Sequence, residues 1–126
     1  MHIKIIVSDI TIICRLRKNK TANEIIKLLP LKSKVNTWGD EIYFEIPKIN
    51  VNIEDNANDI INLGEIAFWI EGNSIAIGFG KTPLSKSNEI RLAARVNIWA
   101  DAEYPEKLKL LSKINNGHDI SIIIKL

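Results

Sequence analysis

Apolar and polar residues alternate along much of this chain, and the alternation predicts a protein rich in β-strands. Residues 3–7 and 10–16 alternate on either side of Ser8 and Asp9, so we expect them to form a hairpin. A second hairpin is expected where Gly72 and Asn73 form a two-residue turn with glycine first. The strands of that hairpin and the other expected strands cover residues 38–46, 65–71, 74–80, 91–99 and 119–126.

Two segments change to helical spacing. Thr21 and Glu24 form a capping box that opens a short helix, and Pro30 ends it. Residues 103–114 predict a second helix, with Leu108, Leu111 and Ile114 on its inner side. Residues 31–37 and 50–63 have the composition of loops, with one helical turn near residues 59–63. Short strands linked mostly by hairpins, with two helices, favour a mainly β fold: a closed β-barrel of about eight strands with two capping helices.

The composition is that of one globular domain covering residues 1–126. Of the 126 residues, 46% are hydrophobic and 25% are charged, which allows a real core and excludes two ordinary domains. Isoleucine occupies 25 positions, and its β-branched side chain favours strands. The bias toward Ile, Lys and Asn suits an AT-rich genome. The absence of Gln and the scarcity of Cys and Met favour a thermophile, whereas the 13 Asn argue against one.

The near-neutral net charge of +2 is a sum of unlike segments. Residues 1–37 carry eight basic and two acidic residues, residues 38–75 carry one and eight, and residues 76–126 carry eight and five. The aromatic residues lie mostly in the acidic middle, away from the basic start, so we expect no nucleic-acid partner. The apolar start of the chain is broken by polar residues and has no cleavage site, which favours a cytoplasmic protein with no membrane partner.

Three short motifs in order resemble those of the small bacterial and archaeal cyclophilin-like proteins of unknown function. They are Gly39–Phe44, Gly64–Trp69 and Gly78–Pro83. The stretch Lys20–Glu24, which opens a helix after a hairpin, is similar to the corresponding helix start of cyclophilins. The resemblance covers nearly the whole chain. It implies an eight-stranded barrel closed by two helices.

The resemblance does not extend to prolyl isomerase activity. In cyclophilins the strand after the first helix carries a Phe-His-Arg run whose guanidinium contacts the prolyl amide. The corresponding stretch here is Glu41–Glu45, which contains neither arginine nor histidine. Arg95 matches no catalytic position of the family. We therefore expect no isomerase activity.

Other familiar chemistries find little support. The two histidines, His2 and His118, fall at a strand start and in a turn, so neither suits a catalytic base, and Cys14 lies on an apolar strand face. This set offers no zinc-binding spacing. The sequence Gly78–Thr82 lacks the first glycine of a phosphate-binding loop. No cofactor or metal is expected.

The remaining candidate is a groove on the barrel wall, beside a stripe of small residues at positions 74, 76, 78 and 80. Either Trp69 or Trp99 fills the room above that stripe, or the groove binds a small molecule or peptide. The groove would consist of aromatic side chains for the apolar part of a ligand and polar ones for the rest: Tyr43, Trp69, Phe79 and Trp99 with Glu45, Arg95, Asn97 and Thr82.

Two other functions stay open. Glu41 and Glu45 share a strand face and could make a carboxylate-based enzyme, with one of them as base and a metal ion as a possible aid. Alternatively, exposed aromatic residues could form the interface of a homo-oligomer.

Overall fold

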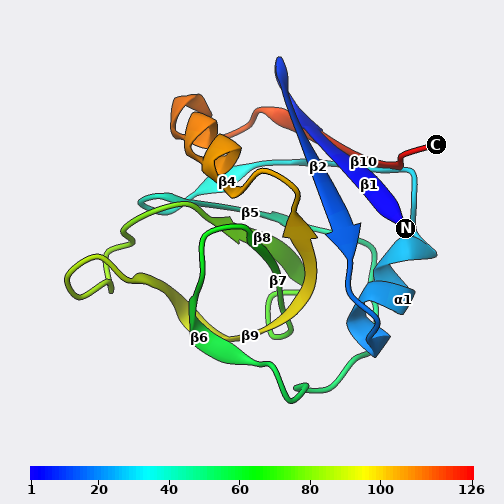
Figure 1. Ribbon diagram of the computed structural model, residues 1–126, viewed down its shortest axis with the longest axis horizontal. Coiled ribbons are helices and arrows are strands. Elements are labelled where there is room, and N and C mark those ends of the chain that lie inside the picture. The colour runs from blue at the N-terminus through cyan, green and yellow to red at the C-terminus, as the bar shows by residue number, and fades with distance from the viewer.

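A computed structural model describes residues 1–126, and its strands curl into a nearly closed barrel (Figure 1). The strands, in chain order, are β1 (His2–Val7), β2 (Ile10–Leu16), β3 (Leu31–Lys34), β4 (Asn36–Thr37), β5 (Glu41–Glu45), β6 (Asn58–Ile61), β7 (Glu65–Trp69), β8 (Ser74–Gly78), β9 (Ile90–Ala102) and β10 (Asp119–Ile124). The helices are α1 (Lys20–Ile26) and the 3₁₀-helix η1 (Pro105–Lys113). The mainly β class and the barrel with two helices are confirmed.

The sheet runs in the order β3-β10-β1-β2-β9-β7-β8-β5-β4, and β6 pairs with β9 beside this path. Only Val35 separates β3, which pairs with β10, from β4, which pairs with β5. The two short strands therefore act as one bent strand that brings the ends of the sheet together. Counted in this way, eight strands surround the barrel, as the resemblance implied.

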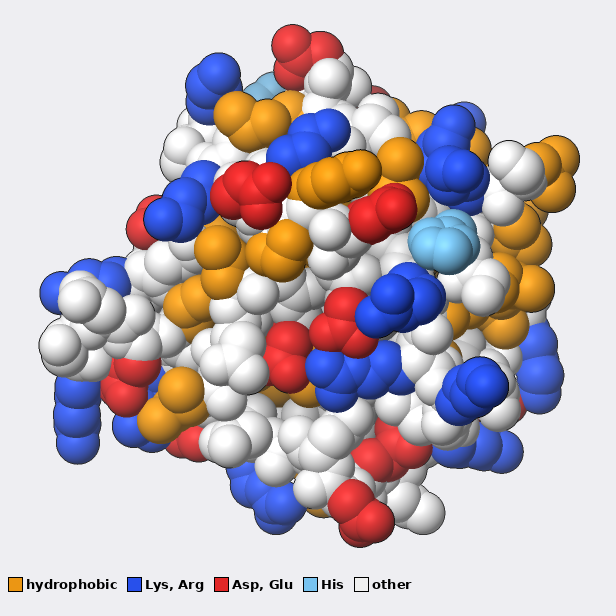
Figure 2. Space-filling model, viewed as in Figure 1, with side chains coloured by type: hydrophobic (Ala, Val, Ile, Leu, Met, Phe, Trp, Pro, Cys, Tyr) orange, Lys and Arg blue, Asp and Glu red, His pale blue; other side chains and the backbone are white.

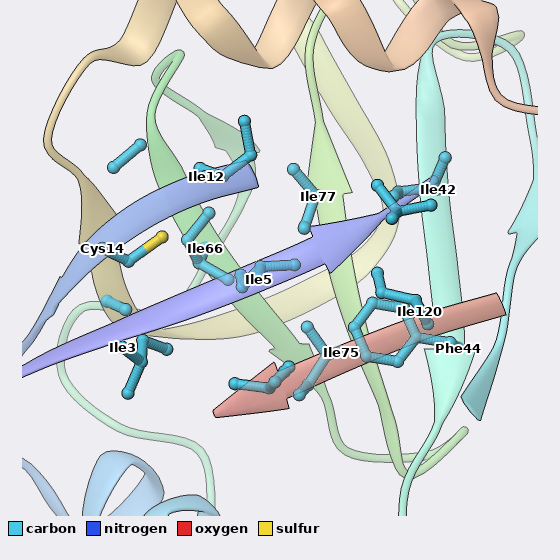
Figure 3. Close-up of a cluster of buried hydrophobic side chains, with 14 of the residues drawn as sticks. Ile3, Ile5, Ile12, Cys14, Ile42, Phe44, Ile66, Ile75, Ile77 and Ile120 are labelled. Carbon is cyan, nitrogen blue, oxygen red and sulfur yellow. The ribbon is translucent and has the colours of Figure 1, made fainter. Parts of the chain in front are cut away.

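Isoleucine fills the barrel. The inward faces of the strands and both helices contribute to one cluster of 27 buried residues. On β1, Ile3, Ile5 and Val7 are fully buried, and Figure 3 shows the first two beside Cys14 and Ile12 of the neighbouring strand β2. The alternation along these strands thus matches the expected inward face.

A second, smaller apolar cluster lies on the opposite side of the sheet. Ile66 and Phe68 of β7 point into the barrel, whereas Ala67 between them packs outside with Ala76 of β8. The start of β9 and the strand β6 cover this outer face. A Cβ on Gly78 would lie 2.6 Å from Cγ2 of Ile90, so the small residue allows β9 to approach. The stripe of small residues at positions 74, 76, 78 and 80 is thus covered at Gly78 by aliphatic side chains and not by Trp99.

Several local expectations were wrong. Asn19, and not Thr21, caps α1, because its side chain accepts the Ala22 N–H at 2.9 Å while the Thr21 hydroxyl bonds Glu54. Residues 31–37 form β3 and β4 and residues 58–61 form β6, because neighbouring strands offer backbone partners that composition alone does not reveal.

The helix near the C-terminus and the β7–β8 turn also differ in detail. Residues 105–113 are 3₁₀ and not α-helical, although Leu108, Leu111 and Ile114 are buried as expected. In the turn after β7, the positive φ of 45° belongs to Asn73. Gly72 serves a different purpose, which concerns Trp69 and is described below.

Charged side chains of both signs are interspersed on the face seen in Figure 2. The basic start and the acidic middle of the chain meet directly at Arg17, which lies 3.0 Å from Glu65. Arg17 also pairs with Asp101 of β9, at 2.7 Å. Neither helix has the length and apolar character that crossing a membrane requires.

Candidate functional site

A small apolar pocket lies on the outer side of the barrel wall, where β5, β7 and β8 face the start of β9. Its volume is about 160 Å³. Nine residues line it, and all but one are hydrophobic: Trp38, Glu41, Tyr43, Trp69, Ala76, Leu92, Ala93, Ala94 and Val96. We call this the Glu41 pocket, after its single charged residue.

The register of the sheet creates the floor and the aromatic wall. Tyr43 of β5 stands opposite Ala76 of β8, which in turn stands opposite Ala67 of β7. Two methyl side chains thus leave space beside a phenol ring. Trp69, at the end of β7, meets Tyr43 edge to face, with ring centroids 6.2 Å apart and planes at 87°. Such contacts hold aromatic rings in a defined orientation.

Gly72 fixes the position of the Trp69 indole. A Cβ at residue 72 would lie 2.3 Å from both Cε3 and Cζ3 of Trp69, closer than any packed side chain tolerates. The indole therefore lies directly over the backbone of the turn. Glycine is needed here for this close approach and not for a positive φ.

An irregularity in β9 provides the opposite wall. Asn58 of β6 pairs with Val96, but Ile60, only two residues later, pairs with Arg91. The extra residues of β9 bulge out of the ladder, and Leu92, Ala93 and Ala94 line the pocket from there. Bulges of this kind re-aim side chains and occur often beside functional sites.

Glu41 is the unusual member of the lining. Only 7% of its surface is exposed. Its carboxyl forms neither a hydrogen bond nor an ion pair with another residue, and its oxygens keep some contact with solvent at the pocket. Burial raises the pKa of Glu41 to about 7, from an ordinary value of 4.5. The carboxyl therefore changes charge near neutral pH, where it could exchange a proton with a ligand or pair with a cation.

Two of the expected ligand-binding residues, Tyr43 and Trp69, are brought together in the pocket. Phe79 and Trp99 are not there, because both are buried in the main core. The Trp99 indole Nε1–H donates to the Ala67 carbonyl at 3.1 Å. Its polar atom thus has an internal partner, and its ring is part of the interior rather than of the groove.

The four expected polar residues also lie outside the lining. Glu45 is exposed at the far end of β5, opposite Ser74, and Arg95 is exposed on β9. The Thr82 hydroxyl donates to the Arg91 carbonyl and so holds the loop before β9. The groove expected from the sequence therefore does not form from those eight residues.

Asn97 is fully buried and joins three segments. Its Nδ2 donates to the Asn52 carbonyl at 2.8 Å and to the Thr21 hydroxyl at 3.1 Å. Its Oδ1 accepts the Glu54 N–H at 2.9 Å. Both amide hydrogens and the oxygen of its side chain therefore have partners within the chain, so its role here is to hold the segment before β6 against α1 and β9.

Sequence reasoning missed Trp38 and the alanines of the β9 bulge. The small residue at position 76 did signal space beside Tyr43, but nothing in the sequence revealed that β9 would close over it. The sequence placed Glu41 on the same strand face as Glu45, which is exposed, but did not reveal the burial of Glu41. It is buried because the outer layer formed by β9 covers this end of β5.

Other reactive groups do not gather. Nowhere do three or more His, Cys, Asp or Glu side chains come close enough to hold a metal ion. Cys14 is buried in the barrel, and this burial, with the nearby charge of Asp101, raises the pKa of its thiol to about 12. The thiol stays protonated and out of contact with solvent.

Comparison with known proteins finds others that share this fold. A family model described as Cyclophilin-like matches residues 1–123. A hypothetical protein from Archaeoglobus fulgidus, solved in solution, is 32% identical, with a TM-score of 0.80 over 99% of this chain and 95% of that chain. McbB in complex with tryptophan has a TM-score of 0.69 at 16% identity, over 98% of this chain and 44% of that chain, a likeness of fold alone. No curated protein matches the sequence.

Proposed function

This chain belongs to the cyclophilin-like family, and we propose that it binds a small molecule, or one side chain of a peptide, in the Glu41 pocket. Of the residues first expected to line a groove, Tyr43 and Trp69 are kept in this site, and none of the four polar residues is. It assigns recognition to the barrel wall and no covalent step to the protein.

The observation that carries the proposal is the unpartnered carboxyl of Glu41 in an apolar lining. Holding an ionised carboxyl where it loses most of its water is unfavourable, and the raised pKa of Glu41 reflects this cost. Valine or leucine at this position would avoid that cost. A ligand that bonds the carboxyl would offset it, and recognition explains why such a group stands there.

The size of the pocket limits the ligand. Pockets for drug-sized molecules hold about 300–1,000 Å³, whereas a cavity of about 150 Å³ accepts one benzene ring. At about 160 Å³, the Glu41 pocket fits a single ring or a short branched chain. McbB, which shares the fold, has been solved with tryptophan, so one protein of this fold binds a small aromatic molecule.

The proposal excludes prolyl isomerisation. The strand that carries the arginine of cyclophilins corresponds here to β5, with the sequence Glu41-Ile42-Tyr43-Phe44-Glu45. A carboxylate in place of a guanidinium reverses the charge offered to a prolyl amide. A standard prolyl-isomerisation assay should therefore show no acceleration over the uncatalysed rate, and clear turnover would contradict this part of the proposal.

The three tryptophans of the chain make the binding test direct. Trp38 and Trp69 line the pocket, whereas the Trp99 indole is buried with its N–H bonded internally. In a ¹⁵N-labelled sample, titration with phenol, benzyl alcohol and benzylamine should shift the indole signals of Trp38 and Trp69 and leave that of Trp99 in place.

Two variants sharpen this titration. Ala94→Leu adds three carbon atoms to the lining and should abolish the shifts by filling the pocket, whereas Ala57→Leu, in a loop outside it, should leave them unchanged. If every one-ring compound leaves all three indole signals in place at saturating concentration, the pocket does not bind ligands and the proposal is wrong.

A second candidate function is acid–base catalysis by Glu41, and its pKa of about 7 favours it. A carboxyl poised near neutral pH can both accept and release a proton, as general acid–base catalysis requires. The test is incorporation of deuterium from D₂O into carbon positions of any compound that binds. Exchange that is lost in Glu41→Gln and kept in Glu45→Gln would support catalysis. Binding without deuterium exchange would mean that the pocket recognises the compound and does not catalyse its exchange.

A further inference from the structure

The Glu41 pocket combines a buried carboxyl with three aromatic rings, and this combination suits one class of ligand. Trp38, Tyr43 and Trp69 line the same cavity, and Glu41 is its only group that can carry charge near neutral pH. Aromatic faces attract cations through the ring quadrupole, and a carboxylate pairs with them directly.

We propose that the ligand of the Glu41 pocket is an organic ammonium cation no larger than one ring, held by the Glu41 carboxylate and the aromatic walls. This inference rests on the proposed function and names its ligand class. The ammonium would donate to the carboxylate, and its carbon skeleton would fill the space beside Ala76 and the β9 alanines.

A cation accounts for the lining better than a neutral ligand or an anion does. An anion would be repelled by Glu41, and no lysine, arginine or histidine lines the pocket to receive it. A neutral ring would leave the ionised carboxyl unpaired. An ammonium satisfies the carboxylate and meets rings that tolerate positive charge, so each feature of the lining is used.

The pairing makes binding dependent on pH. The titratable groups facing the cavity are Glu41 and the phenol of Tyr43, because β7, β8 and the β9 bulge contribute only Trp69, alanines, Leu92 and Val96. Arg95 is exposed and does not line the cavity. The carboxyl of Glu41 is neutral in acid and ionised in base, so an ammonium should bind more tightly as the pH rises through neutrality.

The test compares two probes of nearly equal shape, benzylammonium and benzyl alcohol, titrated at about pH 8, where Glu41 is ionised and benzylamine is still protonated. On the natural protein, benzylammonium should bind at least about tenfold more tightly than the alcohol. Glu41→Gln should abolish this preference. Glu45→Gln, on the same strand face but exposed, should keep it.

Capped lysine amide, titrated in parallel, distinguishes the source of the cation. If it binds as tightly as benzylammonium, the ammonium comes from a peptide side chain; if it does not, the ligand is a free amine. Equal affinities for benzylammonium and benzyl alcohol, or a preference that survives in Glu41→Gln, would overturn the inference while leaving the proposed function standing. Failure of both probes to bind the pocket would overturn both.

Discussion

Tyr43 and Trp69 come from two strands that do not pair with each other, yet their rings meet edge to face at 6.2 Å. The strand β8 lies between them, with Ala76 opposite Tyr43 and Ser74 opposite Trp69. These two small residues allow the rings to meet above β8 and leave the space beside Ala76 that forms the pocket. The contact therefore links sheet register directly to the shape of the candidate site.

Gly72→Ala should damage the pocket without damaging the barrel. The added Cβ would lie 2.3 Å from two carbon atoms of the Trp69 ring, so the indole must move away from its place beside Tyr43. We expect the affinity for one-ring compounds to fall about tenfold and the Trp69 indole signal to shift. The Trp99 signal should not move.

Gly117→Ala is the control for this substitution. Nothing lies within 4 Å of a Cβ at residue 117, although its φ of +89° makes alanine somewhat strained. It should lower stability by about 1 kcal/mol and leave ligand affinity unchanged. Equal loss of affinity in both variants would mean that Gly72 acts through general stability and not through Trp69.

Glu41 should make the protein less stable as the pH rises from about 4.5 to about 7. Because burial raises its pKa, the folded state keeps a proton over this window that the unfolded state has lost. The free energy of unfolding should fall by about 3 kcal/mol across it. Urea unfolding at about pH 5 and about pH 8, for the natural protein and for Glu41→Gln, measures the difference.

Other carboxyls work in the opposite direction, so the comparison with the variant is essential. The pKa values of Glu24 and Asp119 are lowered by hydrogen bonds from Lys27 and Lys34, and their contributions are lost as the pH falls. These contributions are the same in the natural protein and in Glu41→Gln, so they cancel when the two pH dependences are subtracted. If the natural protein and Glu41→Gln show the same pH dependence, the Glu41 carboxyl is not desolvated and the pocket described above is incorrect.

Asn97→Ala should destabilise the fold and spare the pocket. The substitution removes the three hydrogen bonds that the buried Asn97 side chain forms with Thr21, Asn52 and Glu54. We expect a loss of about 3 kcal/mol in the free energy of unfolding, with faster amide exchange in residues 52–56. Asn88→Ala, at an exposed position, should change little. If the folded Asn97→Ala variant loses ligand affinity, Asn97 takes part in binding, contrary to this prediction.

Cys14 should resist thiol reagents in the folded protein. It has no exposed surface, and its thiol is protonated well above neutral pH. Labelling by a chromogenic disulfide reagent at about pH 8 should be slow and should accelerate as urea opens the barrel. Rapid stoichiometric labelling in the absence of urea would contradict the buried position on β2.

The fold could be predicted because most strands of the barrel carry their own alternation of apolar and polar residues. Ile3, Ile5 and Val7 alternate with more exposed residues, and the same pattern recurs around the barrel, so local periodicity identifies the inward face. Strands β3 and β6 escaped prediction because they are short and polar. Their hydrogen bonds come from β10 and β9, which lie far away in the sequence.

The candidate site was only partly predictable for the same reason. Tyr43 and Trp69 stood out as aromatic residues on outward strand faces. The burial of Glu41 depends on the β9 bulge, and a bulge that forms against β6 leaves no periodic trace. Phe79 and Trp99 were expected to line a groove beside the small residues at positions 74, 76, 78 and 80, but both are buried in the main core. The Ala67 carbonyl accepts the Trp99 indole N–H there.

The central claim is that ligands enter the pocket beside Glu41, and intermolecular nuclear Overhauser effects from a bound one-ring compound test it most directly. We expect contacts from the ring protons of the ligand to Tyr43, Trp69 and the methyl groups of Ala76 and Ala94. Contacts confined to another surface, such as the polar hollow around Arg17 and Asp101, would contradict it.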